Sequence, residues 1–161
     1  MVRGKIDKVK DNIKYIRGDA TRPVGEGTKI IAHCCNDIGA WGAGFVMAIS
    51  RRWPEPKKEY KRFVKHGCGL GDVLYVKCEE DIWVANIIGQ KGIHKRGNQV
   101  PIRYGAIRKG FISLKKHALK RNATVHIPDM IGCGLAGGSR QEMIKIINEE
   151  LEGIDVYVYK I

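Results

Sequence analysis

A glycine-rich segment between an apolar run and a helix-like pattern most constrains the fold of this chain. The segment extends from Asn36 to Phe45 (NDIGAWGAGF) and follows the run Lys29 to Cys35, which is typical of a buried strand. The sequence therefore predicts a strand, a glycine loop and a helix in succession. In the helix, apolar residues recur at intervals of three or four, at Phe45, Val46, Ile49 and Trp53.

The glycines of this loop suit a phosphate group. Gly39, Gly42 and Gly44 carry no side chains, so consecutive backbone amides can approach a ligand. The helix behind them adds unpaired N–H groups and the positive end of its dipole. The spacing matches neither the dinucleotide-binding fingerprint nor the Walker motif, so a glycine connection without a ligand remains compatible with this loop taken alone.

A second segment of the same kind favours a ligand. Ile131 to Ser139 (IGCGLAGGS) follows the short apolar run Thr124 to Pro128 and precedes another helical pattern. Ligands of open α/β sheets lie beyond the carboxyl ends of the strands, so two such loops can face each other across one cleft. A shared ligand is therefore expected, and a diphosphate fits it.

Four segments, in this order, resemble the macrodomain family. They are GDAT at residues 18–21, AHCCNDIGAWGAGF from Ala32, VANIIGQ at residues 84–90 and IGCGLAGG from Ile131. The resemblance covers nearly the whole chain and is closest to the branch of the ADP-ribose 1''-phosphate phosphatases and the terminal ADP-ribose protein glycohydrolases. It implies a single macrodomain over residues 1–161, a three-layer α/β/α sandwich with a mixed central sheet of about six strands, and ADP-ribose as ligand.

The resemblance also implies roles for individual residues. Asp19 would accept a hydrogen bond from the adenine amino group, with Ala20 beside it, and Tyr159 would lie next to the adenine. Asn36 would contact the distal ribose. The amides of two loops would hold the diphosphate: Gly42, Ala43, Gly44 and Phe45 in the first, and Gly132, Cys133, Gly134, Leu135, Ala136 and Gly137 in the second.

Residue chemistry leaves an alternative for several of these roles. Asp19 is also a suitable turn residue at a strand end, and Asn36 can begin an Asx turn. Tyr159 can instead cover the core from an edge strand. Asp37 can supply a carboxylate to a water as general base, but it can equally cap the loop. The predicted catalytic residues are Asn36 and Asp37.

The reaction depends on where the chain departs from the family pattern. The glycohydrolases carry an attacking lysine and an assisting aspartate where this chain has Gln90 and Ala136. Lys91 is adjacent, and a shift of one residue stays open, but no acidic residue follows GCGL before Glu142. Lysine-based covalent cleavage is therefore not expected. Cys133 is expected to be structural, because no histidine pattern accompanies it.

The predicted activity is removal of the phosphate of ADP-ribose 1''-phosphate. One alternative is a non-catalytic module that binds ADP-ribose. Another is a hydrolase that releases ADP-ribose from ADP-ribosylated protein without the family lysine. No cofactor and no metal are expected, since neither loop has a cluster of oxygen ligands near it.

The remaining elements are those of an α/β fold. Helices are predicted after Trp53, around Tyr104 to Ala118 and around Met143 to Leu151, and His33 and His126 are expected inside strands. Further strands are predicted at Asn12 to Arg17, at Asp72 to Lys77 and Ile82 to Ile88 as a hairpin, and at Asp155 to Lys160. Because the two strands of a hairpin are antiparallel, the sheet is expected to be mixed.

The composition of the chain limits which classes of partner are expected. The 29 basic and 17 acidic residues give a net charge of +12, but eleven of the lysines and arginines fall on two predicted helices as solvated faces do, so nucleic acid is not an expected partner. The five cysteines lack metal-site spacing, and Cys34 and Cys35 should point to opposite faces of one strand.

No apolar run approaches the ~20 residues of a membrane span. With a basic amino-terminal segment that lacks the apolar core of a signal peptide, the protein is expected in the cytoplasm.

Overall fold

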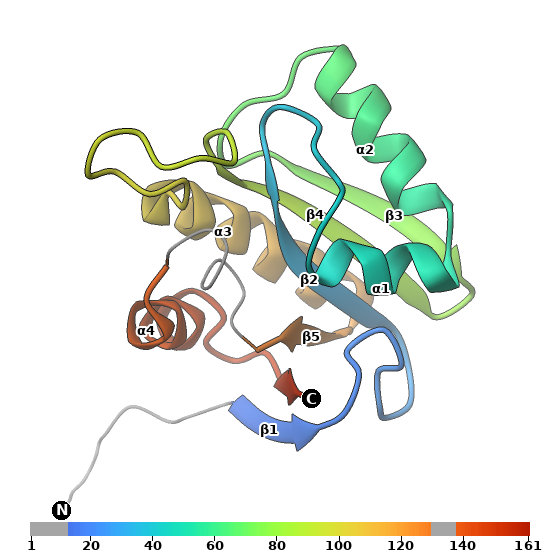
Figure 1. The fold of residues 1–161 in the computed structure, drawn as a ribbon. Helices are drawn as coiled ribbons and strands as arrows, with labels where there is room; N and C mark the ends of the chain where they lie inside the picture. Colours follow the sequence, from blue (N-terminus) through green and yellow to red (C-terminus); the bar gives the residue numbers. More distant parts are fainter. Residues whose placement is uncertain (1–12, 130–137) are drawn as a thin grey trace, which may run out of the picture.

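The central sheet has six strands in the order β1-β6-β5-β2-β4-β3 (Figure 1). The computed structural model describes residues 13–129 and 138–161. Neighbouring strands are parallel except β3, which runs antiparallel to β4 because the two form a hairpin. The prediction of a mixed sheet is confirmed. The strands are β1 (Ile13–Arg17), β2 (Lys29–Asn36), β3 (Val73–Glu79), β4 (Ile82–Gln90), β5 (Thr124–Pro128) and β6 (Val156–Lys160).

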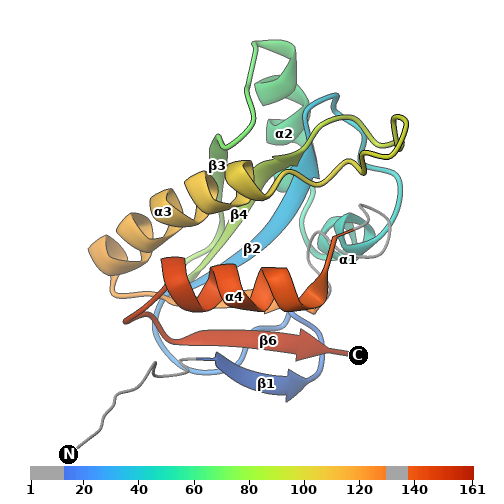
Figure 2. The same cartoon turned by 90° about the vertical axis from the view of Figure 1, so that its left-hand side faces the viewer.

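Helices cover both faces of the sheet, and this makes the predicted three layers (Figure 2). α3 and α4 lie against one face, where Phe111 and Ile146 join Ile30 and Val156 in one apolar cluster. α1 and α2 lie against the other face, where Ile49 and Tyr60 join Ile31 in a second cluster. The described helices are α1 (Phe45–Arg52), α2 (Glu55–Lys65), α3 (Tyr104–Arg121) and α4 (Arg140–Glu150).

The central strands β2 and β4 are apolar almost throughout because helices cover them on both sides. Consecutive side chains of β2 therefore enter different layers. Cys34 packs beside the α3 and α4 cluster, whereas Cys35 belongs to the α1 and α2 cluster, which confirms their expected opposite directions. His33 and His126 are buried in strands, as predicted.

The ends of the parallel strands position the loops that carry function. β1, β2, β5 and β6 run in the same direction, so the segments that follow Arg17, Asn36, Pro128 and Lys160 emerge at one edge of the sheet. A register shift between Cys35 and Asn36 interrupts the regular pairing with β4 at the end of β2. Such irregularities are frequent beside binding sites, where they redirect a side chain.

Candidate functional site

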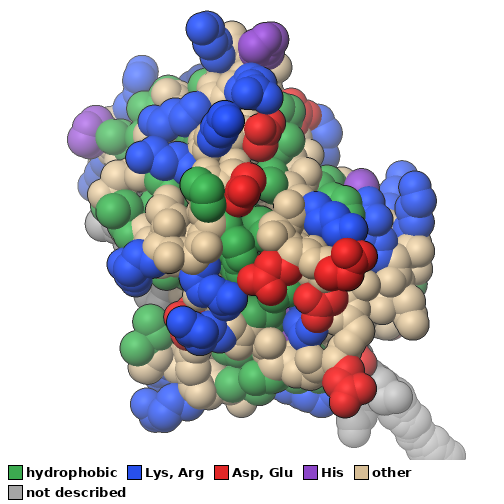
Figure 3. Space-filling view, turned by 90° about the vertical axis from the view of Figure 1, so that its right-hand side faces the viewer, with side chains coloured by type: hydrophobic (Ala, Val, Ile, Leu, Met, Phe, Trp, Pro, Cys, Tyr) green, Lys and Arg blue, Asp and Glu red, His purple; other side chains and the backbone are tan. Residues whose placement is uncertain are grey.

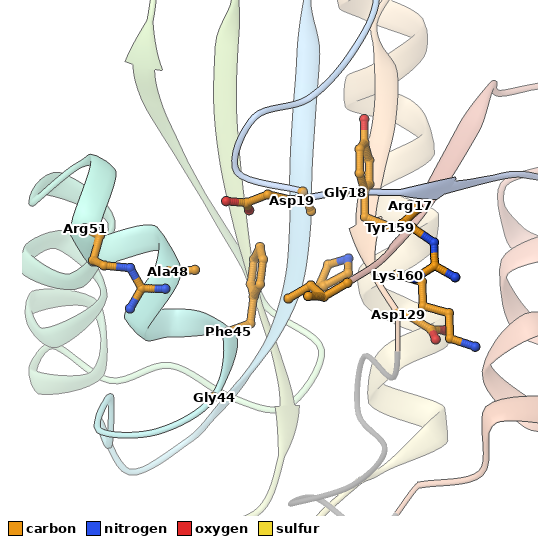
Figure 4. A pocket seen from close by; sticks show the side chains of 13 residues that line it. Arg17, Gly18, Asp19, Gly44, Phe45, Ala48, Arg51, Asp129, Tyr159 and Lys160 are labelled. Carbon is orange, nitrogen blue, oxygen red and sulfur yellow. The ribbon is translucent and has the colours of Figure 1, made fainter.

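A cleft of about 850 Å³ opens at the carboxyl edge of the sheet, beside the first turn of α1 (Figure 4). This is the place where open α/β sheets bind their ligands. Four segments distant in sequence build its walls. They are Arg17 to Ala20 at the end of β1, four residues on one side of α1 and just before it (Gly44, Phe45, Ala48 and Arg51), Pro128 and Asp129 at the end of β5, and Tyr159 to Ile161 at the end of β6.

The structure brings five of the predicted site residues into this cleft, namely Asp19, Ala20, Gly44, Phe45 and Tyr159. Four others are in the described part of the chain but outside the cleft wall, namely Asn36, Asp37, Gly42 and Ala43. The predicted second loop, from Gly132 to Gly137, falls outside the described residues, and its role stays a prediction.

Tyr159 forms one wall of the cleft from a fixed position. Its side chain is 3% exposed, and its hydroxyl accepts a hydrogen bond from the backbone N–H of Val24 at 2.9 Å. The same hydroxyl lies 2.7 Å from Nδ1 of the buried His126. Burial raises the pKa of Tyr159, so the phenol keeps its proton at neutral pH. The ring therefore presents a rigid aromatic surface to the cleft.

Asp19, just after β1, both forms a turn and lines the cleft. Its Oδ1 accepts hydrogen bonds from the backbone N–H and from the hydroxyl of Thr21, both at 2.8 Å, which is the turn role left open by the sequence. The residue nevertheless lines the cleft, and Figure 4 shows its carboxylate on the side of Phe45. The turn bonds hold the carboxylate in a defined orientation, and a ligand donor can meet it there.

The start of α1 offers backbone donors to the cleft. Gly44 precedes the helix with φ 83° and ψ −149°, a conformation that is essentially restricted to glycine. No side chain caps this end of the helix, and its first turn contains no acidic residue. The first N–H groups and the positive end of the helix dipole are therefore available to an anion. This agrees with the phosphate chemistry that the glycine loop predicts.

Asn36 lies at the end of β2, and its amide is engaged inside the loop. Its Oδ1 accepts from the backbone N–H of Ile38 and Ala40 at 3.1 and 3.0 Å, and its Nδ2 donates to the carbonyl of Ala40 at 2.9 Å. The hydroxyl of the buried Tyr60 lies 2.8 Å from the same Oδ1. Asn36 thus organises the glycine loop, the Asx-type role that the sequence left open. Its contact with a distal ribose stays a prediction.

Asp37 and the end of β4 are connected across the sheet. Asp37 Oδ1 accepts from the backbone N–H of Gly92 at 2.8 Å, while its own N–H donates to the carbonyl of Gln90 at 3.0 Å. The carboxylate is therefore oriented by the segment after β4. Lys91 is exposed, and neither it nor Gln90 lines the cleft. A cleft-facing amine at the family's lysine position is thus absent from the described residues.

Several residues of the cleft were missed by the sequence reasoning. Ala48 and Arg51 follow Gly44 at intervals of four and three, so they share one face of α1, and this spacing could have identified them. Asp129 directly follows β5, at the strand end where ligand groups gather. Arg17 and Lys160 could not be found this way, because nothing local in the sequence shows that β1 and β6 are neighbours.

The described cysteines are thiols rather than reactive thiolates. Burial raises the pKa of Cys34 to about 12, and burial also raises the pKa of Cys35 well above its usual value. Cys68 and Cys78 also have raised pKa values, with burial as the main cause. Within residues 13–129 and 138–161, no group of His, Cys, Asp and Glu side chains could hold a metal ion.

The positive charge is spread over the molecular surface. α2 exposes basic residues along its outer side, as the sequence predicts for a solvated helix face: Lys57, Lys58, Lys61, Arg62 and Lys65. Figure 3 shows basic side chains over the upper part of one face and a group of acidic side chains below them. Of the helices in the described ranges, none has the length and apolar character required to span a membrane.

Two named relatives match about nine tenths and about two fifths of this chain, and no family model matches it. Chromodomain-helicase-DNA-binding protein 1-like of Mus musculus is 31% identical over 163 residues, which cover 92% of this chain and 18% of that protein. The ADP-ribose 1''-phosphate phosphatase of Lodderomyces elongisporus is 33% identical over 72 residues, which cover 42% of this chain and 44% of that protein. The chain therefore spans less than a fifth of the first relative and less than half of the second.

Two solved structures match nearly the whole chain. A protein of unknown function from Bacteroides thetaiotaomicron superimposes with a TM-score of 0.90 and 45% identity, over 92% of this chain and 98% of that one. A macrodomain protein from Streptomyces coelicolor superimposes with a TM-score of 0.82 and 42% identity, over 92% of this chain and 99% of that one. This identity over almost the full length of both chains confirms the resemblance: the chain belongs to the macrodomain family.

Proposed function

We propose that the cleft binds ADP-ribose and that the protein hydrolyses a derivative of it, removing the phosphate of ADP-ribose 1''-phosphate. The observation that carries the binding proposal is the first turn of α1, where Gly44 has a glycine-only conformation and the helix N–H groups have no side-chain cap. A diphosphate at this point would accept hydrogen bonds from the backbone amides. Arg51 lines the same wall and adds positive charge.

The adenine end would lie between β1 and β6. The Asp19 carboxylate is an acceptor for an exocyclic amino group, and Tyr159 offers a fixed aromatic surface beside it. Ala20 lines the same part of the cleft, and its methyl group adds little bulk beside a flat base. This assignment places the base at one end of the cleft and the diphosphate at the other, the order that one molecule of ADP-ribose requires.

The hydrolytic step would transfer the phosphoryl group to water and release ADP-ribose and inorganic phosphate. The attacking water must lose a proton, and the oxygen on the distal ribose must gain one as the bond to phosphorus breaks. Asp37 is the proposed base, because its carboxylate is already oriented by the Gly92 N–H. The phosphatase name of the Lodderomyces elongisporus relative supports a hydrolase of this type.

The activity is tested by measuring phosphate release from ADP-ribose 1''-phosphate against a buffer control. We expect turnover by the wild-type protein and a large loss in Asp37→Asn, which keeps the side-chain size and the acceptor for Gly92. The variant should still bind ADP-ribose, because the residues proposed to hold the adenine and the diphosphate, among them Asp19, Gly44 and Tyr159, are unchanged. Absence of phosphate release from folded wild-type protein would eliminate the phosphatase proposal and leave the binding proposal intact.

A non-catalytic ADP-ribose-binding module is the second candidate. It is favoured by Asn36, whose amide is engaged within its own loop, and by Gln90 at the position of the family's lysine. Saturable ADP-ribose binding without turnover would select this function. An assay on ADP-ribosylated protein belongs beside it, because release of ADP-ribose there would instead select a hydrolase that works without the lysine.

A further inference from the structure

Two positive side chains face each other across the edge of the sheet. Arg17 of β1 and Lys160 of β6 are register partners in the parallel pair, and both are exposed. Like charges directly opposite each other destabilise a pair of strands. Within residues 13–129 and 138–161, neither side chain has an ion pair with an acidic residue. The pair is therefore an uncompensated positive site at the end of the cleft.

These two residues also line a second, smaller cavity. It has a volume of about 280 Å³, and its other lining residues are Tyr15, Ile16 and Arg140. We call this cavity the basic groove. Because Arg17 and Lys160 line both the cleft and the basic groove, the two cavities are adjacent and share these side chains as a common wall. A charged group at the edge of a ligand in the cleft can thus reach these two side chains.

The basic groove combines positive charge with an aromatic ring. Tyr15 is 53% exposed, and the Arg140 guanidinium lies 5.9 Å from the centroid of its ring. Arg140 is already paired with Asp129, at 3.1 Å. Of the cations that line the basic groove, Arg17 and Lys160 are therefore the two without an ion pair to an acidic residue in the described part of the chain. An anion in the groove would relieve their mutual repulsion.

The strand geometry tells which part of the ligand would reach the groove. Successive side chains of a strand point to opposite faces, so Tyr159 and Lys160 diverge at the end of β6. Figure 4 shows Arg17 and Lys160 away from Phe45, toward Asp129. With the adenine beside Tyr159, the groove lies beyond the adenosine half, at the opposite end from the diphosphate site at α1.

From these observations we infer that the basic groove takes a phosphate carried by the adenosine half of the ligand. The inference rests on the proposed ADP-ribose site and specifies which ligands that site prefers. A phosphomonoester on the adenosine ribose and the diphosphate of a further nucleotide unit attached there share this chemistry. In both, a phosphate would lie between Arg17 and Lys160 and accept charge-assisted hydrogen bonds from them.

The test compares two ligands by calorimetry on the full chain: ADP-ribose and its 2'-phosphate, in which the adenosine ribose carries a monoester. Wild-type protein should bind the 2'-phosphate about tenfold more tightly at low ionic strength, because charge-assisted bonds of this kind are worth that much. The preference should shrink with added salt. A third ligand carries a second ADP-ribose unit on the adenosine ribose. If it gains more affinity over ADP-ribose than the 2'-phosphate does, the groove prefers the diphosphate of a further nucleotide unit. If it gains less, the groove prefers a phosphomonoester.

Variants separate the groove from general charge effects. Arg17→Gln and Lys160→Gln should bring the affinity ratio of the two ligands toward one. Lys14→Gln is the matched control, because it removes the same charge from β1 but belongs to the opposite face, where Lys14 lies over the Tyr157 ring at 5.3 Å. It should retain the wild-type ratio.

The possible outcomes distinguish the phosphate subsite from the proposed ADP-ribose binding on which it rests. Equal affinity of folded wild-type protein for both ligands would overturn the groove assignment while leaving ADP-ribose binding in place. A ratio that Arg17→Gln and Lys160→Gln leave unchanged would overturn it as well. If neither ligand binds, the proposed function fails, and the phosphate subsite fails with it.

Discussion

The hydroxyl of Tyr159 lies 2.7 Å from Nδ1 of His126, beneath the wall of the cleft. The Val24 N–H already donates to the same oxygen, so the phenolic proton is free to be shared with Nδ1 when that nitrogen is unprotonated. With Nδ1 as acceptor, the proton of His126 is on Nε2, which lies 2.7 Å from the Thr124 hydroxyl. A neutral imidazole thus satisfies every group of this chain of hydrogen bonds.

Stability should fall in mildly acidic solution because two buried histidines resist protonation. Burial lowers the pKa of His33 from 6.5 to about 4 and that of His126 to about 3. Below pH 6.5 the unfolded chain binds protons that the folded chain does not, so the free energy of unfolding decreases as the pH falls toward 4. Each histidine contributes about 1.4 kcal/mol per pH unit in this window.

Urea unfolding at several pH values checks this expectation. In His126→Gln, which does not titrate, the dependence of unfolding free energy on pH between 6.5 and 4 should weaken by about one histidine's share. The variant will also be less stable at pH 7, so the slope rather than the absolute value is the readout. A slope equal to that of the wild type would show that His126 is not a buried neutral base.

Asp19→Asn separates ligand recognition from the turn after β1. An asparagine Oδ1 can still accept from Thr21, as Asp19 Oδ1 does at 2.8 Å, but the charge and the second acceptor oxygen are lost. ADP-ribose binding should weaken by roughly 1.5 to 3 kcal/mol, on the order of tenfold to a hundredfold. Thermal stability should change little. Unchanged affinity in the folded variant would remove the adenine role of Asp19.

Gly44→Ala should damage the start of α1. The residue has φ 83° and ψ −149°, so a side chain there costs about 1 to 3 kcal/mol of stability, and the displaced amides should weaken ADP-ribose binding. Gly42→Ala is the control for stability, because its φ is not positive and a Cβ there meets nothing within 4 Å. Equal unfolding midpoints for the two variants would contradict the proposed backbone requirement.

Gly89→Ala should disturb the packing of α3 against the sheet. A Cβ at this position would lie 2.7 Å from Cys34 Sγ and would also overlap the end of Ile107. Overpacking of this kind costs about 1 to 3 kcal/mol, measurable by denaturant unfolding. Gly105→Ala, at the start of the same helix, meets nothing within 4 Å and should be neutral or slightly stabilising. A neutral Gly89→Ala would show that the contact is loose.

Much of the fold follows from local sequence patterns. β5 (Thr124–Pro128) has the predicted bounds, and the hairpin of β3 and β4 differs by only one or two residues at its ends, because turn chemistry and apolar runs are local signals. The pairing of β1 with β6 is not local, since the strands are separated by most of the chain. The positive pair of Arg17 and Lys160 was therefore invisible before the structure.

The candidate site was predicted in part for the same reason. Asp19, Gly44 and Tyr159 follow recognisable motifs and line the cleft. Asn36 follows an equally clear motif, but Tyr60 on α2 and the Ala40 backbone engage its amide, and no sequence pattern specifies that competition. The single domain over residues 1–161 and the diphosphate role of the second loop stay predictions.

Calorimetric titration of ADP-ribose into the wild-type protein tests the central claim most directly. We predict saturable binding with one site per chain, weakened in both Asp19→Asn and Gly44→Ala while circular dichroism shows each variant folded. Binding that is insensitive to both changes would move the site away from this cleft. Folded wild-type protein that binds no ADP-ribose would contradict the proposed function itself.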